Sequence, residues 1–320
     1  MGVKCSQYLG GLDSLVLFVV NENSGNGRGK KIWAQVEAQL RIQGTAYGKV
    51  VTKSESEAIT LVRDFLKRGN LKAIAVVGGD GTLHSLLPVL ATSGIPYGII
   101  PSGSGNDTSR ALGIPRDPLK ALDIIVAGYT RRIDLLETAT ESGDKQLTLT
   151  AVAVGLDAMV AADVNGSRYK KWCNKLGIGS LAYVIGLLRA LAKYKPGPIT
   201  VTMDGIKHEF KRGWLSAISN VSTYGGGLQI CPDALPDDGH LHVCIVHSCS
   251  VRRILFIFPA VLTGNHVKLH RFVTILSGRS VTVQGAAPML AFGDGEPSGE
   301  TPISAVIRPR QLDFLITASG

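Results

Sequence analysis

Short apolar runs alternate with helical segments over the first 135 or so residues, and this alternation constrains the fold most. The strand-like runs are residues 14–20, 46–52, 73–77 and 97–100. The helical segments between them are residues 28–42, 54–68 and 83–90. Short strands that are separated by single helices predict an α/β domain with a doubly wound, mostly parallel sheet. Ligands of such sheets bind at the carboxyl ends of the strands.

The rhythm of the sequence changes after about residue 136. Alternating runs dominate from Pro198 onward, and Asp204-Gly205 between two of them predicts a two-residue hairpin. Helices are expected over residues 176–193 and 251–262, and separate strands over 304–307 and 312–316. This half therefore predicts an antiparallel β-sandwich with a few helices. We expect two domains, residues 1–135 and 136–320, and leave open whether the last strand, near 310–320, returns to the first domain.

The charge balance points to an anionic partner. The chain has 34 Lys and Arg against 25 Asp and Glu, a net charge of +9 that is spread along the sequence. A diffuse excess favours a small phosphorylated ligand or a lipid surface over duplex DNA, and we expect no nucleic acid partner. The basic run around Lys170-Lys171-Trp172 suits either anionic headgroups or an ordinary solvated helix face.

Cysteine usage and hydropathy indicate a cytoplasmic protein. The five cysteines are odd in number and form no CxxC pair, which argues against a disulfide scaffold and a zinc ribbon. The apolar runs 176–188 and 254–264 are shorter than the ~20 residues that span a bilayer. Residues 1–6 match a myristoylation template, a pattern that often occurs by chance. His266 and His270 are four residues apart, and a solvated helix end explains them better than a metal site.

Three loops rich in Gly, Ser and Asn each follow a predicted parallel strand. They are residues 21–27 (NENSGNG), 78–82 (GGDGT) and 101–107 (PSGSGND). Glycine lets the backbone approach a phosphate closely, and a helix N-terminus supplies unpaired N–H donors. We expect the three loops to converge at one edge of the sheet. Neither a Walker A motif nor a Rossmann G-x-G-x-x-G is present.

These loops and several later motifs resemble the diacylglycerol kinase catalytic family, in particular the short, soluble lipid kinases related to sphingosine kinases. The GGDGT motif alone is shared with NAD kinases and phosphofructokinases. Its combination with PSGSGND, with Pro232-Asp233-Ala234 through Asp237-Asp238-Gly239, and with Asp294-Gly295-Glu296 is more specific. Gly155-Leu156-Asp157-Ala158 also matches, and the motifs follow the family's order over nearly the whole chain.

The resemblance implies an N-terminal nucleotide-binding domain, a β-rich lipid-substrate domain and a cleft between them. It implies that ATP contacts residues of the first domain. These are Asn21, Asn23, Ser24, Gly25, Thr52, Gly79, Asp80, Gly81, Thr82, Leu83, His84, Ser85, Ser104 and Asn106. Glu296 corresponds to the proposed general base, with Asp294 and Asp80 as further catalytic positions.

The resemblance also implies a structural Mg²⁺. Its matching ligands are the Leu235 carbonyl, the Asp238 carboxylate and the His240 carbonyl. Asp80, Asp107 and Asp134 match a carboxylate network that connects the ion to the nucleotide site. An oxygen-only set with one carboxylate suits a Mg²⁺ that retains several waters. Taken without the resemblance, residues 237–239 are equally typical of a plain turn.

The chain departs from the family pattern at three positions near the nucleotide. Glu22 replaces the proline of the usual Asn-Pro, which adds a negative charge near phosphates. His84 and Ser85 stand where Asn-Glu usually follows GGDGT. These changes leave the nucleotide preference open, although Asp294-Gly295-Glu296 is intact.

The sequence thus predicts a lipid kinase that uses ATP and Mg²⁺, with diacylglycerol as the first-choice acceptor. A sphingoid base or phosphatidylglycerol is the next acceptor. A NAD kinase-like enzyme for a soluble metabolite and a non-catalytic nucleotide or lipid binder are the alternatives. We expect a lipid substrate at a membrane surface and peripheral contact with the inner face of the membrane. The oligomeric state, including a homodimer, is left open.

Overall fold

The computed structural model describes residues 15–52, 54–167, 169, 173 and 179–318. The acylation pattern in residues 1–6 and the run Lys170-Lys171-Trp172 lie outside the described residues. The chain divides into two compact units, and the first is formed by two separate stretches, Met1–Ile133 and Gln311–Gly320. The second unit is Asp134–Arg310. Two strands, β5 (Thr130–Thr140) and β15 (Ile303–Leu315), pass from one unit to the other.

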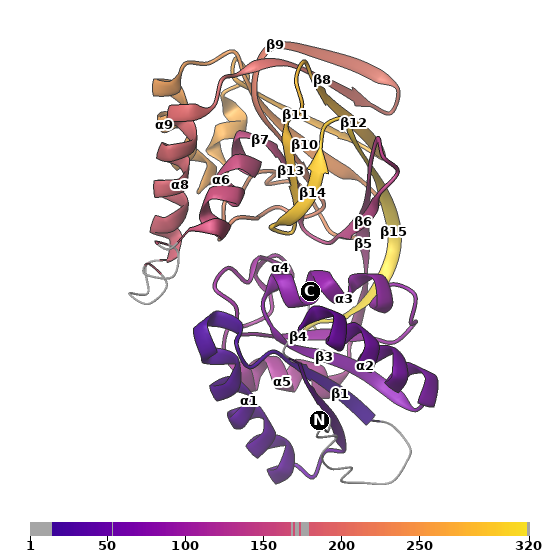
Figure 1. Ribbon diagram of the computed structural model, residues 1–320. Coiled ribbons are helices and arrows are strands. Elements are labelled where there is room, and N and C mark those ends of the chain that lie inside the picture. The colour runs from indigo at the N-terminus through magenta and orange to yellow at the C-terminus, as the bar shows by residue number, and fades with distance from the viewer. Residues whose placement is uncertain (1–14, 53, 168, 170–172, 174–178, 319–320) are drawn as a thin grey trace. The chain divides into compact units, whose positions relative to one another are not determined.

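The first unit is a parallel sheet with helices on both faces (Figure 1), as the strand–helix alternation predicted. Its sheet order is β2-β1-β3-β4, with the end of β15 beside β4. The strands are β1 (Leu15–Val20), β2 (Tyr47–Val51), β3 (Leu71–Gly78) and β4 (Tyr97–Pro101). The helices are α1 (Ser24–Ile42), α2 (Glu55–Arg68), α3 (Asp80–Leu90), α4 (Asp107–Ala111) and α5 (Pro118–Ala127). α1 packs with α5, and α2 packs with α3.

Local sequence signals explain where these elements begin and end. Ser54 caps α2, because its Oγ accepts a hydrogen bond from the Glu57 N–H at 3.3 Å. Gly69 ends the same helix with φ of 74°. The central strands β1 and β3 are almost wholly buried, which explains their continuous apolar sequence. In α1 the residues 25–27 have left-handed dihedrals, so the regular helix starts at Arg28, where the sequence predicted it.

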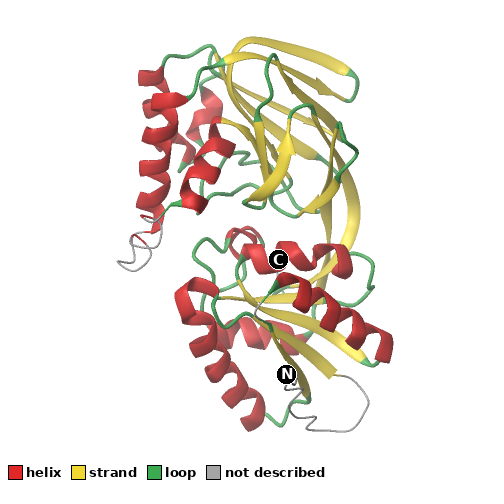
Figure 2. Ribbon diagram, viewed as in Figure 1, coloured by secondary structure: helices red, strands yellow, loops and turns green. Residues whose placement is uncertain are grey.

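The second unit is mostly antiparallel β structure with helices on one side (Figure 2). The strands that complete it are β6 (Lys145–Thr148), β7 (Ala151–Gly155), β8 (Gly197–Met203), β9 (Ile206–Ser219), β10 (Leu241–His247), β11 (Val273–Gly278), β12 (Ser280–Gly285), β13 (Leu290–Gly293) and β14 (Glu296–Glu300). The main sheet runs β14-β13-β7-β9-β8-β12-β15, and β10 pairs with β9 and β11. The helices are α6 (Leu156–Gly166), α8 (Gly179–Lys193), α9 (Val251–Val261) and the 3₁₀ helix η1 (Asn265–Lys268).

Two large apolar clusters account for most of the described core of this unit. One lies among the strands and includes Val201, Val243 and Val283. The other lies where α6, α8 and α9 pack, and it includes Trp214 and Ile257. A β-sandwich with a few helices was the sequence prediction, and it is confirmed.

The hairpin and the final strands test the finer predictions. Asp204 and Gly205 have φ of 46° and 83° and join Met203 to Ile206, as the two-residue turn required. The two strands that were expected over 304–307 and 312–316 are a single strand, β15. The residues between the two expected strands, 308–311, belong to β15 and lie where this strand leaves one unit and enters the other.

Candidate functional site

The three glycine-rich loops of the first unit meet at the carboxyl ends of β1, β3 and β4, as predicted. Asn21 Nδ2, at the end of β1, donates a hydrogen bond to Thr82 Oγ1 on α3 at 2.8 Å. Ser24 Oγ is hydrogen-bonded to Ser102 Oγ, which joins the first loop to the third. The backbone N–H of Ser102 donates a hydrogen bond to the Gly78 carbonyl at 2.8 Å. Side-chain and backbone bonds therefore hold the loops in one place.

Glycine is required where two of these loops touch. A Cβ on Gly79 would lie 2.9 Å from the Gly103 Cα, and a Cβ on Gly103 would lie 2.6 Å from the Gly79 Cα. Any other residue would force the loops apart. Gly79 is also the N-cap of α3 and has no side chain to occupy the first N–H groups of that helix. Those N–H groups and the positive end of the helix dipole suit an anionic group such as a phosphate.

Asp80 uses its carboxylate to hold the loop after β4. Its Oδ2 accepts a hydrogen bond from the Asp107 N–H at 3.0 Å, and its Oδ1 accepts one from the Thr108 N–H at 3.1 Å. Arg110 NH1 donates to Asp107 Oδ1 at 2.8 Å and completes this arrangement. Burial, and to a lesser extent the Asp80 charge, raise the pKa of Tyr97 well above its usual value. Asp80 is thus a positioning residue in the described structure, because its carboxylate supports the 107–108 backbone.

The remaining residues that the resemblance assigned to ATP lie in or beside the same loops. Thr52 follows β2 and is buried, and its N–H donates to the Val20 carbonyl at 3.2 Å. Leu83 has its side chain in the core, so only its backbone is available to a ligand. Ser85 Oγ donates to the Thr82 carbonyl at 3.0 Å. Ser104 is exposed at the tip of the third loop.

Asn106 and Arg28 both bond to the Gly103 carbonyl. Asn106 has φ of 54°, and its Nδ2 donates to this carbonyl at 2.9 Å. Its buried Oδ1 has no hydrogen-bond partner among the described residues. The Arg28 guanidinium also donates to the Gly103 carbonyl. Sequence reasoning missed Arg28, although a basic residue directly after a glycine-rich loop was a signal for it.

In the second unit a rigid turn carries Glu296. Gly293 pairs with Glu296, and the two turn residues Asp294 and Gly295 have φ of 51° and 84°. Positive φ at both positions is typical of a type I′ turn, for which Asp-Gly is a preferred sequence. Glu296 is half-buried as the first residue of β14. Its backbone is thereby fixed by a hairpin and not by a mobile loop.

Asp294 anchors this turn to the segment between β6 and β7. Its Oδ2 accepts a hydrogen bond from the Leu149 N–H at 2.8 Å. Its Oδ1 accepts from the Thr150 N–H at 2.8 Å and from Thr150 Oγ1 at 2.6 Å. The resemblance gave Asp294 as a catalytic position. In the structure its carboxylate positions the hairpin that bears Glu296.

Asp134 anchors the segment expected to hold Mg²⁺. This fully buried carboxylate accepts hydrogen bonds from the Gly239 N–H and the Arg310 N–H, both at 2.7 Å. The Asp134 N–H donates to the Pro236 carbonyl at 2.6 Å. Of the expected carboxylate network, Asp134 therefore contacts this segment directly, at Pro236 and Gly239. Asp80 and Asp107 belong to the first unit.

The donor chemistry of this segment fits Mg²⁺. Leu235, Asp238 and His240 bring two backbone carbonyls and one partly exposed carboxylate within six residues. Asp238 Oδ1 accepts a hydrogen bond from the His240 N–H at 2.9 Å, which fixes the carboxylate in the turn. The described residues contain no group of three His, Cys, Asp or Glu that could hold a metal. A set of two carbonyls and one carboxylate suits a hard cation that keeps several waters.

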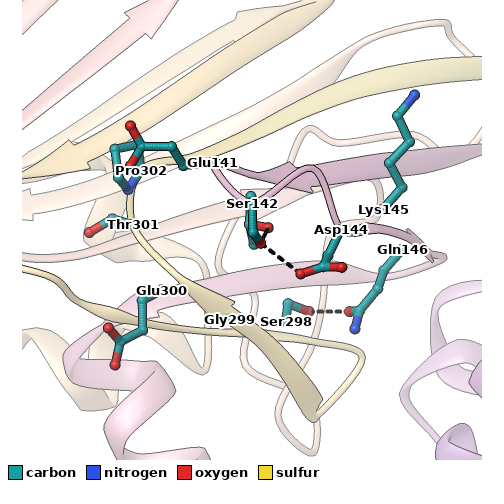
Figure 3. Close-up of a pocket in the computed structure, with 11 residues that line it drawn as sticks. Glu141, Ser142, Asp144, Lys145, Gln146, Ser298, Gly299, Glu300, Thr301 and Pro302 are labelled. Atoms are coloured by element: carbon teal, nitrogen blue, oxygen red, sulfur yellow. Dashed lines mark hydrogen bonds between the residues drawn. The ribbon is translucent and has the colours of Figure 1, made fainter.

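A cavity of about 570 Å³ lies elsewhere in the second unit (Figure 3). It is lined by the β5–β6 turn and the end of β14. Ser142 Oγ donates to Asp144 Oδ2 at 2.6 Å, and Ser298 Oγ donates to Gln146 Oε1 at 2.8 Å. Glu296 does not line this cavity.

Asp157 forms a second polar cluster that the sequence did not predict. Its Oδ2 accepts a hydrogen bond from Tyr224 Oη at 2.8 Å, and its Oδ1 accepts from the Ala158 N–H at 3.0 Å. Burial raises the pKa of Asp157 to about 7. Burial, with a smaller contribution from the Asp157 charge, raises the pKa of Tyr194 to about 12. The motif Gly155–Ala158 drew attention to Asp157 in the sequence, but nothing in the sequence pattern indicated that its carboxyl group is buried and bonded to Tyr224.

We predict that Asp157→Asn changes how stability depends on pH. The raised pKa means that the folded protein retains a proton which the unfolded chain releases, so this group lowers stability as the pH rises from about 4 to about 7. The neutral variant avoids that loss. The difference in free energy of unfolding between the variant and the natural chain should therefore increase by about 3 kcal/mol, in favour of the variant, from about pH 5 to about pH 8. Urea unfolding at the two pH values measures it.

Asp163→Asn, on the same helix, is the control for removal of a carboxylate from α6. The prediction is wrong if the stability difference between Asp157→Asn and the natural chain is the same at both pH values.

Comparison with known proteins agrees with this architecture. Residues 15–138 match the family model of the diacylglycerol kinase catalytic domain. Residues 150–316 match the YegS C-terminal NAD kinase beta sandwich-like domain. A structure of a putative diacylglycerol kinase from Bacillus anthracis superposes with a TM-score of 0.75 at 22% identity, covering 96% of both chains. That likeness supports the fold.

Curated relatives cover nearly the whole chain. A diacylglycerol kinase of Mycobacterium tuberculosis is 33% identical over 307 residues, which is 95% of this chain and 96% of that protein. The putative lipid kinase YtlR of Bacillus subtilis is 25% identical over 92% of this chain and 97% of its own length. With both domain models matched in order, the chain belongs to the diacylglycerol kinase catalytic-domain family and is an enzyme of the lipid kinase class.

Proposed function

We propose that this enzyme transfers the γ-phosphoryl group of ATP to a lipid hydroxyl, with diacylglycerol as the acceptor and Mg²⁺ as the required cation. The observation that carries the proposal is the meeting of three glycine-rich loops at the carboxyl ends of β1, β3 and β4. Parallel sheets bind ligands at this edge, and the free N–H groups of α3 there suit phosphate oxygens.

The first unit would bind and orient ATP. Gly79 and Gly103 allow two loops to lie against each other, and the absence of side chains there would let the backbone approach the phosphates closely. Asp80 holds the 107–108 backbone in place, and Asn21 holds Thr82. Phosphoryl transfer depends mainly on such positioning and on neutralisation of charge. Arg28 is a cation beside the same loops and would contribute to that neutralisation.

Bound Mg²⁺ would supply charge neutralisation at the transferred phosphoryl group. A structural Mg²⁺ would be held separately in the second unit by Leu235, Asp238 and His240, and Asp134 keeps their segment in shape through the Gly239 N–H.

Glu296 would act as the general base. Its carboxylate would accept the proton of the lipid hydroxyl as that oxygen attacks the γ-phosphorus. Asp294 would contribute by position, because it accepts three hydrogen bonds that anchor the turn before Glu296. Asn165 Nδ2 donates to the Gly295 carbonyl at 2.7 Å and supports the other side of the turn.

Diacylglycerol is proposed as the acceptor because the Mycobacterium tuberculosis relative carries the name diacylglycerol kinase and matches over nearly the full length of both chains. Such a substrate requires contact with a membrane surface, and we propose that this contact is peripheral and cytoplasmic. Among the described residues, no helix is both long and apolar enough to cross a bilayer.

We predict that Glu296→Gln abolishes phosphoryl transfer. The amide keeps the shape of the side chain but cannot accept the proton, so the rate should fall by about 10²–10⁴-fold with ATP affinity nearly unchanged. The measurement is transfer of labelled γ-phosphate from Mg·ATP to lipids in mixed micelles, followed by organic extraction. Diacylglycerol, monoacylglycerol, sphingosine, ceramide and phosphatidylglycerol are tested side by side.

NAD is assayed separately in the aqueous phase with the same label. Label in NAD alone would contradict the lipid acceptor and support a soluble-metabolite kinase. Nucleotide binding without label in any acceptor would support a non-catalytic binder. Label in a lipid other than diacylglycerol would support the lipid kinase reaction and show that the acceptor is that lipid and not diacylglycerol.

We predict that Asp294→Ala lowers activity through the position of Glu296. The substitution removes three hydrogen bonds, which should cost about 1–3 kcal/mol of unfolding free energy and reduce kcat at least about tenfold. The chain offers a matched control in Asp204, which also precedes glycine in a hairpin. Its carboxylate accepts hydrogen bonds from the Arg279 N–H, the Ser280 N–H and Ser280 Oγ.

Asp204→Ala should therefore destabilise the second unit by a similar amount without a comparable fall in kcat. Equal losses of kcat in the two variants would show that Asp294 acts only through general stability.

A further inference from the structure

Helix α9 lies within a long stretch of sequence that has no acidic residue. The 55 residues 239–293 contain no Asp or Glu, although the whole chain has 25 acidic residues among 320. The Lys and Arg residues of this stretch are Arg252, Arg253, Lys268, Arg271 and Arg279. Its charged side chains at neutral pH are therefore all positive.

α9 has two apolar sides, and only one of them is buried. Ile254, Ile257 and Val261 pack into the core cluster that also includes side chains of α8. On the other side Leu255 is 43% exposed and Phe256 is 80% exposed. Val251 and, just after the helix, Leu262 are also exposed. Large apolar side chains that are exposed together in this way mark an interaction surface.

Arginine side chains flank these exposed apolar residues. The Arg253 guanidinium lies over the Phe272 ring at 4.4 Å from its centroid, and the Arg271 guanidinium lies 5.7 Å from the same ring. One aromatic ring thus holds two cations beside α9. Arg252 is exposed on the helix itself. The backbone of a further arginine, Arg212, is tied to the segment just before α9, because its carbonyl accepts a hydrogen bond from the Ser248 N–H at 2.8 Å.

We propose that this α9 face docks on the surface of an anionic lipid bilayer. We define the face as Val251, Leu255, Phe256 and Leu262 with Arg252, Arg253 and Arg271. The apolar side chains would enter the boundary between headgroups and acyl chains, and the guanidinium groups would contact lipid phosphates. This inference deepens the proposed function, on which it rests for its biological purpose, because it names the surface that meets the membrane.

Charge favours a bilayer over a second copy of the chain. Two α9 faces in contact would bring arginines of like charge together without a carboxylate from residues 239–293 to compensate them. An anionic bilayer instead offers phosphates to the arginines and an apolar layer to Phe256. Basic and apolar side chains together on one helix are typical of helices that lie in the membrane interface.

The test is co-sedimentation of the full chain with phosphatidylcholine vesicles, with and without phosphatidylglycerol. The natural chain should bind the anionic vesicles more tightly, and added salt should weaken that binding. The double variant Leu255→Ser/Phe256→Ser should bind them about tenfold more weakly, because it removes exposed apolar area. Ile206→Ser is the matched control, since Ile206 is 65% exposed on a hairpin of the same unit.

A charge variant separates the two contributions. Arg252→Gln/Arg271→Gln should lose most of the preference for phosphatidylglycerol and most of the salt dependence, while weak binding to neutral vesicles remains. Equal vesicle binding by the natural chain and the double serine variant would overturn the proposal. So would a dimer of the natural chain, seen by sedimentation velocity without lipid, that the double serine variant lacks.

Kinase assays keep this inference distinct from the proposed function. The double serine variant should phosphorylate diacylglycerol in detergent micelles at the natural rate and fall about tenfold behind it on anionic vesicles. If the natural chain phosphorylates no lipid yet binds vesicles through the α9 face, the proposed function fails and the docking surface stands. If the natural chain phosphorylates lipid and the double serine variant binds vesicles as tightly as the natural chain, the docking surface alone is wrong.

Discussion

In each unit, the segments that carry candidate site residues depend on aspartate carboxylates that accept hydrogen bonds from backbone N–H groups. Asp80 holds the 107–108 backbone, Asp294 holds the segment at Leu149 and Thr150, and Asp134 holds Gly239. A carboxylate has two oxygens, so one side chain can fix two backbone positions that are distant in sequence. Because charge-assisted bonds of this kind are stronger than neutral ones, three aspartates suffice to shape loops that have little regular structure.

In the proposed mechanism, this arrangement separates the residues that position the site from the residue that takes part in the chemistry. The resemblance implies catalytic roles for Asp80 and Asp294, and in the structure the carboxylate of each accepts hydrogen bonds from the backbone of another segment. Glu296 differs from them because it lies at the start of β14 on a turn that another residue anchors. The base that we propose must reach its proton at hydrogen-bond distance, so in that proposal the rigidity of this turn matters as much as the identity of the residue.

The parts of the molecule that follow local rules could be predicted from the sequence. The strand–helix alternation gave the parallel sheet, the 54–57 capping box gave the start of α2, and Asp204-Gly205 gave a hairpin. Features that depend on distant contacts could not be predicted. His266 was expected at a solvated helix end, but it is buried and bonded to the Ile230 carbonyl at 3.0 Å. The partner of Asp157 is Tyr224, 67 residues away, and no periodicity connects the two.

Because residues 311–320 belong to the first unit, they determine which fragments of the protein can fold. Phe314 in β15 pairs with Tyr97 in β4, and their rings lie 5.3 Å apart at 73°. A fragment that ends near residue 135 would lose this strand. It would uncover Tyr97 and leave the backbone of β4 open along one edge, which is a template for aggregation. A folded first unit therefore has to be made by joining residues 311–320 to the end of the first stretch, or by keeping the whole chain.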